Sequence, residues 1–178
     1  TPTRDGWWDD GGKWRRLHYH TWNVDDGGDA QTEWNGCFQG IMQCNVVIED
    51  LETLSPDKFG FSQEEFNNLK AQCRALRAWF YIRLLDAFRH VPLAVSFNDI
   101  SKNSEGQVEP KVIFDFIESE LKESIELLAQ KSSLGGNGSM QGQWTKAGAA
   151  ALLVRLYLNA EVYIGENRYD DCAKYAQD

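Results

Sequence analysis

The sequence predicts an all-α fold of tetratricopeptide-like helical hairpins, preceded by a long loop segment rich in Trp, Gly and Asp. Apolar residues recur at helical intervals after residue 31. Near the end, one helical pattern finishes in Tyr and Ala, a short Gly-containing turn follows, and a new pattern begins with Tyr and Ala on one side, which is typical of such hairpins. Before residue 32, Gly and Asp doublets indicate turns. We therefore divide the chain into a loop-rich aromatic segment, 1–31, and a helical scaffold, 32–178.

Composition limits the partners that the chain can have. Its 178 residues, 42% hydrophobic, suffice for one domain with a real core. The formal net charge of −9 argues against nucleic acid and anionic membranes as partners, and the basic run Lys13–Arg16 is too short to change this. No apolar run approaches the ~20 residues of a membrane span. The chain opens without Met and stops inside a helical pattern, so we expect it to be part of a longer protein.

Two long helices are expected in the first half of the scaffold. The first runs from Thr32 to about Leu54, where Ser-Pro-Asp follows. The second begins at Ser62, whose Ser-Gln-Glu-Glu sequence forms a capping box with Glu65, and it reaches about Phe88 before His-Val-Pro-Leu ends it. One apolar stripe of this second helix is predicted to comprise Phe66, Leu69, Cys73, Leu76, Phe80 and Leu84.

Three further helices are expected in the second half. One begins at Pro110, which suits a first helical turn, and continues to about Leu128. The next runs from about Thr145 to Val162 and starts with small residues that allow a close helix approach. The last begins at Tyr169. The glycine-rich stretch 135–139 between them is a loop without the Lys-Ser/Thr of a phosphate-binding motif.

The cysteines show no pattern of a disulfide or metal framework. No Cys-x-x-Cys spacing occurs, and two cysteines seven residues apart on one helix are ~10 Å apart, too far for a disulfide. We interpret Cys37, Cys44, Cys73 and Cys172 as buried free thiols.

Tryptophans dominate the first 34 residues, which contain five of the seven in the chain. Leu17 and Val24 are the only aliphatic side chains larger than alanine there, so an interlocking core is not expected. Flat indoles among Asp, Asn, Arg and Gly suit a ligand with an apolar face and many hydroxyls, as sugars have. The alternative is that these rings anchor a long loop onto the body of the protein.

Several sequence blocks resemble the SusD/RagB family. The blocks are Cys44-Asn45, Arg74–Tyr81 with Phe88–Leu93 after it, Phe114–Leu121, and most strongly Thr145–Ala160 followed by Val162–Gly165. Their order and spacing cover about four fifths of the chain, which makes the resemblance more specific than any single motif.

The resemblance implies a lipid-anchored, cell-surface protein of the Bacteroidetes outer membrane that takes up nutrient glycans. Such a protein captures starch or other polysaccharide fragments and passes them to a SusC-like TonB-dependent transporter, without catalysis. It also implies that loop aromatics before the first long helix form an arc for the glycan, with Trp8 a better match than Trp7. This chain would then be the N-terminal, tetratricopeptide-containing portion. The candidate glycan-binding residues are Arg4, Trp7, Trp8, Asp9, Asp10, Trp14, Trp22 and Asn23.

Other functions remain open from the residues. His18 and His20 would share a face of a strand and could hold a metal, but no third ligand is evident. Asp25, Asp26 and Asp29 could bind Ca²⁺, although they also fit turns and lack the full loop pattern. We expect no metal site, no cofactor and no enzymatic activity.

Two further hypotheses concern the helices. The arginines of the second helix, Arg74, Arg77, Arg83 and Arg89, form a recognition stripe or, on the interpretation we favour, pair with acids and cap the helix end. The competing function is a tetratricopeptide adaptor that binds a protein in its helical groove, with the Trp-rich segment packed down as a structural flap.

Overall fold

The computed structural model describes residues 10–97, 106–130 and 142–177. The chain divides into two compact units, Thr1–Gly36 and Cys37–Asp178, and the all-α prediction with tetratricopeptide-like hairpins is confirmed. The described residues contain no strand, only an isolated antiparallel bridge between Val91 and Val108. No described helix is long and apolar enough to cross a bilayer.

The first unit contains more helix than the sequence predicts. It comprises η1 (Asp10–Gly12), α1 (Lys13–His18), η2 (Val24–Asp26) and the first residues of α2 (Gly28–Thr53). Helix α2 therefore begins four residues before the predicted Thr32. The Gly and Asp doublets do form turns, but those turns start and end short helices. The predicted domain boundary at residues 31 and 32 stays a prediction.

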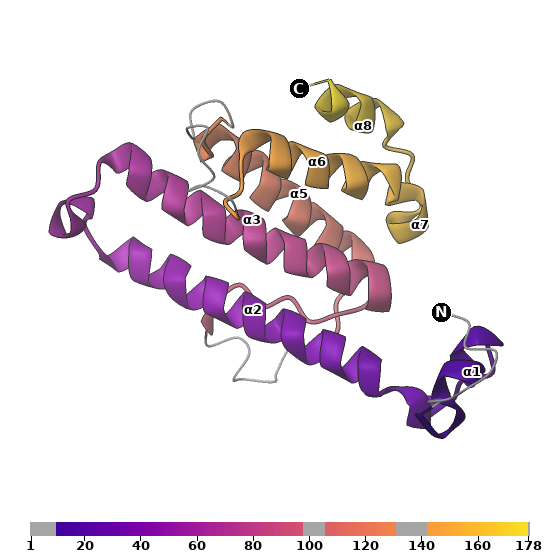
Figure 1. Ribbon diagram of the computed structural model, residues 1–178. Coiled ribbons are helices and arrows are strands. Elements are labelled where there is room, and N and C mark those ends of the chain that lie inside the picture. Colours follow the sequence, from indigo (N-terminus) through magenta and orange to yellow (C-terminus); the bar gives the residue numbers. More distant parts are fainter. Residues whose placement is uncertain (1–9, 98–105, 131–141, 178) are drawn as a thin grey trace. The chain divides into compact units, whose positions relative to one another are not determined.

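The second unit is built from hairpins of antiparallel helices (Figure 1). Helix α2 is followed by η3 (Pro56–Phe59) and α3 (Gln63–Phe88), and then by α5 (Pro110–Leu127) and α6 (Lys146–Leu158). Two short helices, α7 (Ala160–Ile164) and α8 (Tyr169–Ala176), complete it. The helix predicted to be continuous to Val162 is interrupted at Asn159, the C-cap of α6. The side-chain Nδ2 of Asn159 donates to the Arg155 carbonyl oxygen at 2.8 Å.

Local signals set the helix ends as predicted. The Ser62 hydroxyl accepts from the backbone nitrogen of Glu65, and the Glu65 carboxylate accepts from the backbone nitrogen of Ser62, a complete capping box for α3. Pro110 occupies the first turn of α5. Gly165 ends α7 with a φ of 72°, a conformation that glycine adopts without steric cost.

The face that α3 buries differs from the predicted stripe. Leu69 and Leu76 are exposed, and Cys73 and Phe80 are half-buried. The buried face instead carries small residues beside large ones, which lets the neighbouring helices approach closely: Phe66, Ala71, Ala75, Ala78, Tyr81, Ile82, Leu84 and Leu85. Of the predicted stripe, Phe66 and Leu84 are buried as expected.

A buried charge network lies inside this helical core. Arg77 donates to the Glu120 carboxylate from Nε at 2.9 Å and from Nη2 at 2.6 Å, and its Nη1 donates to Asn45 Oδ1 at 2.7 Å. Arg74 donates to the other oxygen of the same carboxylate. Asn45 in turn donates to the Ala94 carbonyl, so the network joins α2, α3 and α5 to the segment after α3. The ion pairs expected for Arg74 and Arg77 are therefore confirmed.

The end of α3 is capped by its own arginine. Arg89 donates from Nη1 to the carbonyl of Leu85 at 2.9 Å, and its guanidinium lies 4.8 Å from the ring centroid of Tyr163. This confirms the capping role expected for an arginine at the helix end. Arg83, by contrast, lies over the Trp79 ring at 5.1 Å.

The cysteines differ in their burial. All four cysteines are free, as predicted. Cys37 and Cys44 are also buried as expected, whereas the burial predicted for Cys73 and Cys172 is wrong, because both are only half-buried. Burial raises the pKa of the Cys44 thiol to about 11, so it stays protonated at neutral pH.

Candidate functional site

The candidate site is the turn between α1 and η2 in the first unit. Helix α1 ends in two hydrogen bonds: His20 N donates to the Leu17 carbonyl at 3.3 Å and Thr21 N to the Arg16 carbonyl at 2.8 Å. This is the Schellman pattern, which needs a left-handed residue after the helix. His20 fills that position with a φ of 55°, where glycine is the usual residue. The turn presents Tyr19 on one side of His20 and Trp22 on the other.

Both rings of this turn are open to solvent. Tyr19 is 64% exposed and Trp22 is 61% exposed. The His18 imidazole packs edge-on against Tyr19, with ring centroids 4.8 Å apart. Large aromatic rings this exposed on an ordered turn are typical of binding surfaces rather than of packing.

Arg16 and Asp26 hold the turn in place. Arg16 donates to the two oxygens of Asp26 from Nε at 2.8 Å and from Nη2 at 2.5 Å, and to the Gly11 carbonyl from Nη1 at 3.0 Å. The Asp26 side chain is only 3% exposed. Hydrogen bonds from Arg16 lower the pKa of the Asp26 carboxyl to about 2, so the pair is fully charged at neutral pH.

The same aspartate organises η2. Asn23 is the N-cap: its Oδ1 accepts from Asp25 N at 2.9 Å, and its own backbone nitrogen donates to Asp26 Oδ2 at 3.2 Å. Nearby, Lys13 pairs with Asp29 at 2.7 Å and lies 4.9 Å from the Trp14 ring centroid. Charged pairs therefore fix the backbone that carries the two exposed rings.

The structure describes four of the predicted site residues, and the other four lie outside the described ranges. Trp22 is exposed, as a sugar platform requires, whereas Trp14 is half-buried and the Asn23 oxygen is used in capping. Asp10 begins η1. Arg4, Trp7, Trp8 and Asp9 lie outside the described residues.

Tyr19 is the residue that sequence reasoning missed. The argument from rings without aliphatic neighbours was applied only to tryptophan, although Tyr19 meets the same criterion. Its position beside a left-handed residue has no signal in the sequence, because histidine seldom ends a helix in this way.

The metal hypotheses do not agree with the geometry. His18 and His20 do not alternate on a strand, because α1 ends at His18 and the chain turns at His20. Asp26 is engaged by Arg16 and Asp29 by Lys13, so turn formation and ion pairing account for these acids. Within the described ranges, no group of three or more His, Cys, Asp or Glu side chains could hold a metal ion.

Comparisons with known proteins show the family of the chain. A family described as "Starch-binding associating with outer membrane" matches residues 3–158. The chain belongs to this SusD-like family. Starch-binding protein SusD of Bacteroides thetaiotaomicron is 29% identical over 150 residues, which are 82% of this chain and 24% of that protein.

Solved structures of the family share the fold. A SusD-like protein of Bacteroides fragilis superposes with a TM-score of 0.76 at 24% identity, over 95% of this chain and 30% of that one. A laminarin-binding SusD-like protein gives a TM-score of 0.66 at 25% identity, over 82% of this chain and 29% of that one. The chain thus spans less than a third of each of these relatives.

Proposed function

We propose that the protein captures oligosaccharides at the outer membrane of the cell and passes them to a SusC-like TonB-dependent transporter. In this role it binds glycan without catalysis, as a lipid-anchored surface protein. The observation that carries the proposal is the exposed pair Tyr19 and Trp22 on a charge-stabilised turn. Membership in a family described as starch-binding and associated with the outer membrane supports it.

The chemistry of the turn suits a weakly held sugar. An aromatic face covers the C–H side of a pyranose, and a rigid ring with two χ angles loses little entropy on binding. Polar contacts exchange water for sugar hydroxyls with small net gain, so we expect dissociation constants of roughly micromolar to millimolar. Such affinity allows release to a transporter. Arg4, Trp7, Trp8, Asp9 and Asp10 remain proposed contributors, with Trp8 the best match to the family's glycan arc.

Calorimetry with defined glycans tests the proposal. Maltooligosaccharides and laminarin oligosaccharides are the first ligands to try, because relatives are described as starch- and laminarin-binding. Trp22→Ala, Tyr19→Ala and Trp8→Ala should each weaken binding about fivefold or more, since an aromatic contact contributes ~1 kcal/mol or more. The matched control is Val24→Ala, an exposed apolar residue of the same region.

The results separate the two functions considered from the sequence. Loss of glycan binding in the aromatic variants, with Val24→Ala unchanged, supports capture. Binding that survives all three aromatic substitutions contradicts this site. Absence of binding to any glycan, with retained folding, favours the adaptor hypothesis.

A further inference from the structure

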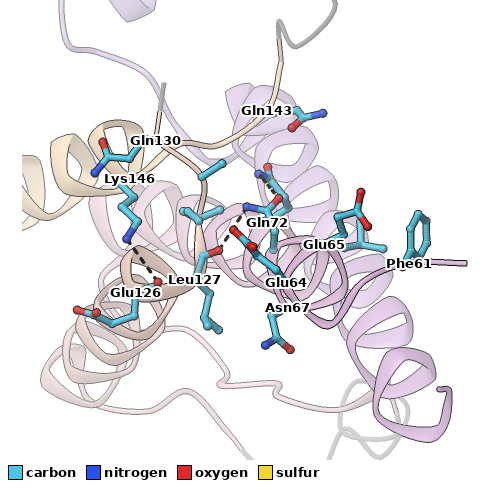
Figure 2. Close-up of a pocket in the computed structure, with 14 residues that line it drawn as sticks. Phe61, Glu64, Glu65, Asn67, Gln72, Glu126, Leu127, Gln130, Gln143 and Lys146 are labelled. Carbon is cyan, nitrogen blue, oxygen red and sulfur yellow. Dashed lines mark hydrogen bonds between the residues drawn. The ribbon is translucent and has the colours of Figure 1, made fainter. Parts of the chain in front are cut away.

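A groove in the second unit has no part in the proposed glycan site. It lies between the start of α3, the end of α5 and the residues just before α6, and has a volume of about 1080 Å³ (Figure 2). Leu69 of α3 and Leu127 of α5 line it and are 39% and 40% exposed. Phe61 extends this apolar strip, stacked on Phe59 with centroids 6.3 Å apart. The space is large enough to take a peptide side chain with its neighbours.

Hydrogen bonds fix the groove walls. The Gln72 side chain pairs with the backbone of Trp144 in both directions, donating to its carbonyl at 2.7 Å and accepting from its nitrogen at 2.6 Å. Asn68 donates to the Leu127 carbonyl at 3.4 Å. Helices α3 and α5 and the segment before α6 are therefore connected around a preformed opening, which reduces the entropy cost of binding.

The lining of the groove contains three carboxylates, and one of them lies at a helix end where the dipole disfavours it. Glu126 lies in the last turn of α5, where the helix dipole is negative and a cation would be favoured. Glu64 and Glu65, in the first turn of α3, add two more carboxylates to the lining. Lys146, the one base among the lining residues, donates to the Glu126 carbonyl at 3.5 Å. Lys146 already supplies one cation at this end of α5, but the three acids leave the lining with a net negative charge that complements a cation of a partner.

We propose that this groove binds a polypeptide segment of another protein that carries apolar side chains flanked by Lys or Arg. An apolar side chain occupies the strip formed by Leu69 and Leu127, and the cation lies at the negative end of α5 near Glu126 and Glu64. This docking uses none of the residues proposed for glycan capture, which lie in the first unit.

Fluorescence anisotropy with defined peptides tests the docking. The probe is a short fluorescein-labelled peptide of alternating leucine and lysine, and its matched control replaces lysine by glutamate. We expect the leucine-lysine peptide alone to bind. Leu127→Asp should weaken binding at least tenfold, because burial of a leucine contributes ~1.5–3 kcal/mol. Glu64→Lys should weaken it severalfold by removing an attraction and adding a repulsion.

Two control variants match these changes. Leu158→Asp alters another exposed leucine, on α6, and Asp170→Lys reverses an acid in the first turn of α8 as Glu64→Lys does in α3. Neither residue lines the groove, so both should bind the peptide as the wild type does. Glu64→Lys changes only an exposed carboxylate. It therefore tests the site even if circular dichroism shows that Leu127→Asp does not fold.

Four outcomes would overturn the proposal. The first is a wild type that does not bind the leucine-lysine peptide, and the second is equal loss of binding in the groove variants and their controls, which indicates general adhesion to an acidic surface. The third is displacement of the peptide by a maltooligosaccharide, which makes the groove a glycan site. The fourth is a dimer by light scattering that Leu127→Asp dissociates, which makes the occupant a second copy.

Discussion

The two units of this chain are stabilised by different physical means. In the second unit, large side chains such as Ile41, Phe114, Leu121 and Leu153 are fully buried, and one charge cluster lies among them. Among residues 11–36, whose burial the structure describes in the first unit, Asp26 alone is buried. Charge pairs organise the region that presents aromatic rings, whereas apolar burial organises the helical hairpins. A binding surface can keep its rings exposed only if something other than those rings holds its backbone.

The largest effect is expected from the buried pair of the second unit. Glu120→Ala leaves Arg77 and Arg74 without their shared carboxylate inside the protein, and this should cost about 3–5 kcal/mol of unfolding free energy. Urea denaturation measures the change. Glu123→Ala is the control, because Glu123 pairs with Arg74 from an exposed position and should contribute less than about 1 kcal/mol.

A double variant checks the cause of that loss. Arg77→Met with Glu120→Leu removes both charges and should recover much of the stability lost in Glu120→Ala. Equal destabilisation by Glu120→Ala and Glu123→Ala would show that the cluster is not effectively buried.

A glycine from each unit tests the difference in packing. A Cβ on Gly40 would lie 2.2 Å from Cζ of Phe80, so Gly40→Ala should lower the free energy of unfolding by about 1–3 kcal/mol. Gly36 lies in the same helix, and a Cβ there meets nothing within 4 Å. Gly36→Ala should therefore raise stability by up to about 1 kcal/mol through helix propensity.

Thermal unfolding measures both variants. If packing differs as described, the stability of Gly40→Ala is lower than that of the wild type and the stability of Gly36→Ala is higher. Two increases would mean that the Phe80 ring, which is half-buried, turns aside at little cost.

Local features of the fold could be predicted from the sequence, whereas the buried face of α3 could not. The capping box at Ser62, Pro110 at the start of α5 and the free thiols follow from neighbouring residues or from spacing. The burial of Ala71 and Ala75 in place of Leu69 and Leu76 depends on which neighbours pack against α3, and periodicity does not contain that information.

The exposure of aromatic rings at the candidate site could be predicted in kind rather than in detail. Composition indicated an aromatic display surface, and Trp22 agrees with it. Composition did not separate Trp22 from the half-buried Trp14, because that difference depends on the turn at His20 and on the contact between Arg16 and Asp26.

Within the described ranges, each unit also contains one residue other than glycine with a positive φ. Arg89 has φ 63° and ψ −72°, and His90 N donates to the Phe88 carbonyl at 2.8 Å, which is a γ-turn of the rare, strained type. Arg89→Ala keeps the strain and loses the side chain, whereas Arg89→Gly loses the side chain and removes the strain. We expect the glycine variant to be more stable than the alanine variant by about 1–2 kcal/mol in urea denaturation.

His20 provides the counterpart in the first unit. His20→Gly and His20→Ala should both leave the global unfolding of the second unit unchanged. A shift of the main transition by His20→Ala would show that the two units unfold together.

Acid titration should give the smallest effect on global stability and the most local one. The pKa of the Asp26 carboxyl is lowered to about 2 from an ordinary value of 3.8. A lowered pKa in the folded state means that the pair stabilises the turn fully above about pH 4 and that this contribution disappears as the pH falls toward 2. The Arg16 Nε–H signal in heteronuclear NMR should titrate with a midpoint near pH 2, and Asp26→Asn should abolish that titration.

The same signal decides whether the charge pair or the rings themselves hold the turn. If Trp22→Ala leaves the Arg16 midpoint near pH 2, the pair forms without help from the exposed indole, and the ring is free to contact a ligand. A midpoint near 3.8 in that variant would mean that Trp22 contributes to the structure of the turn. Its loss of glycan binding could then no longer be attributed to a missing contact.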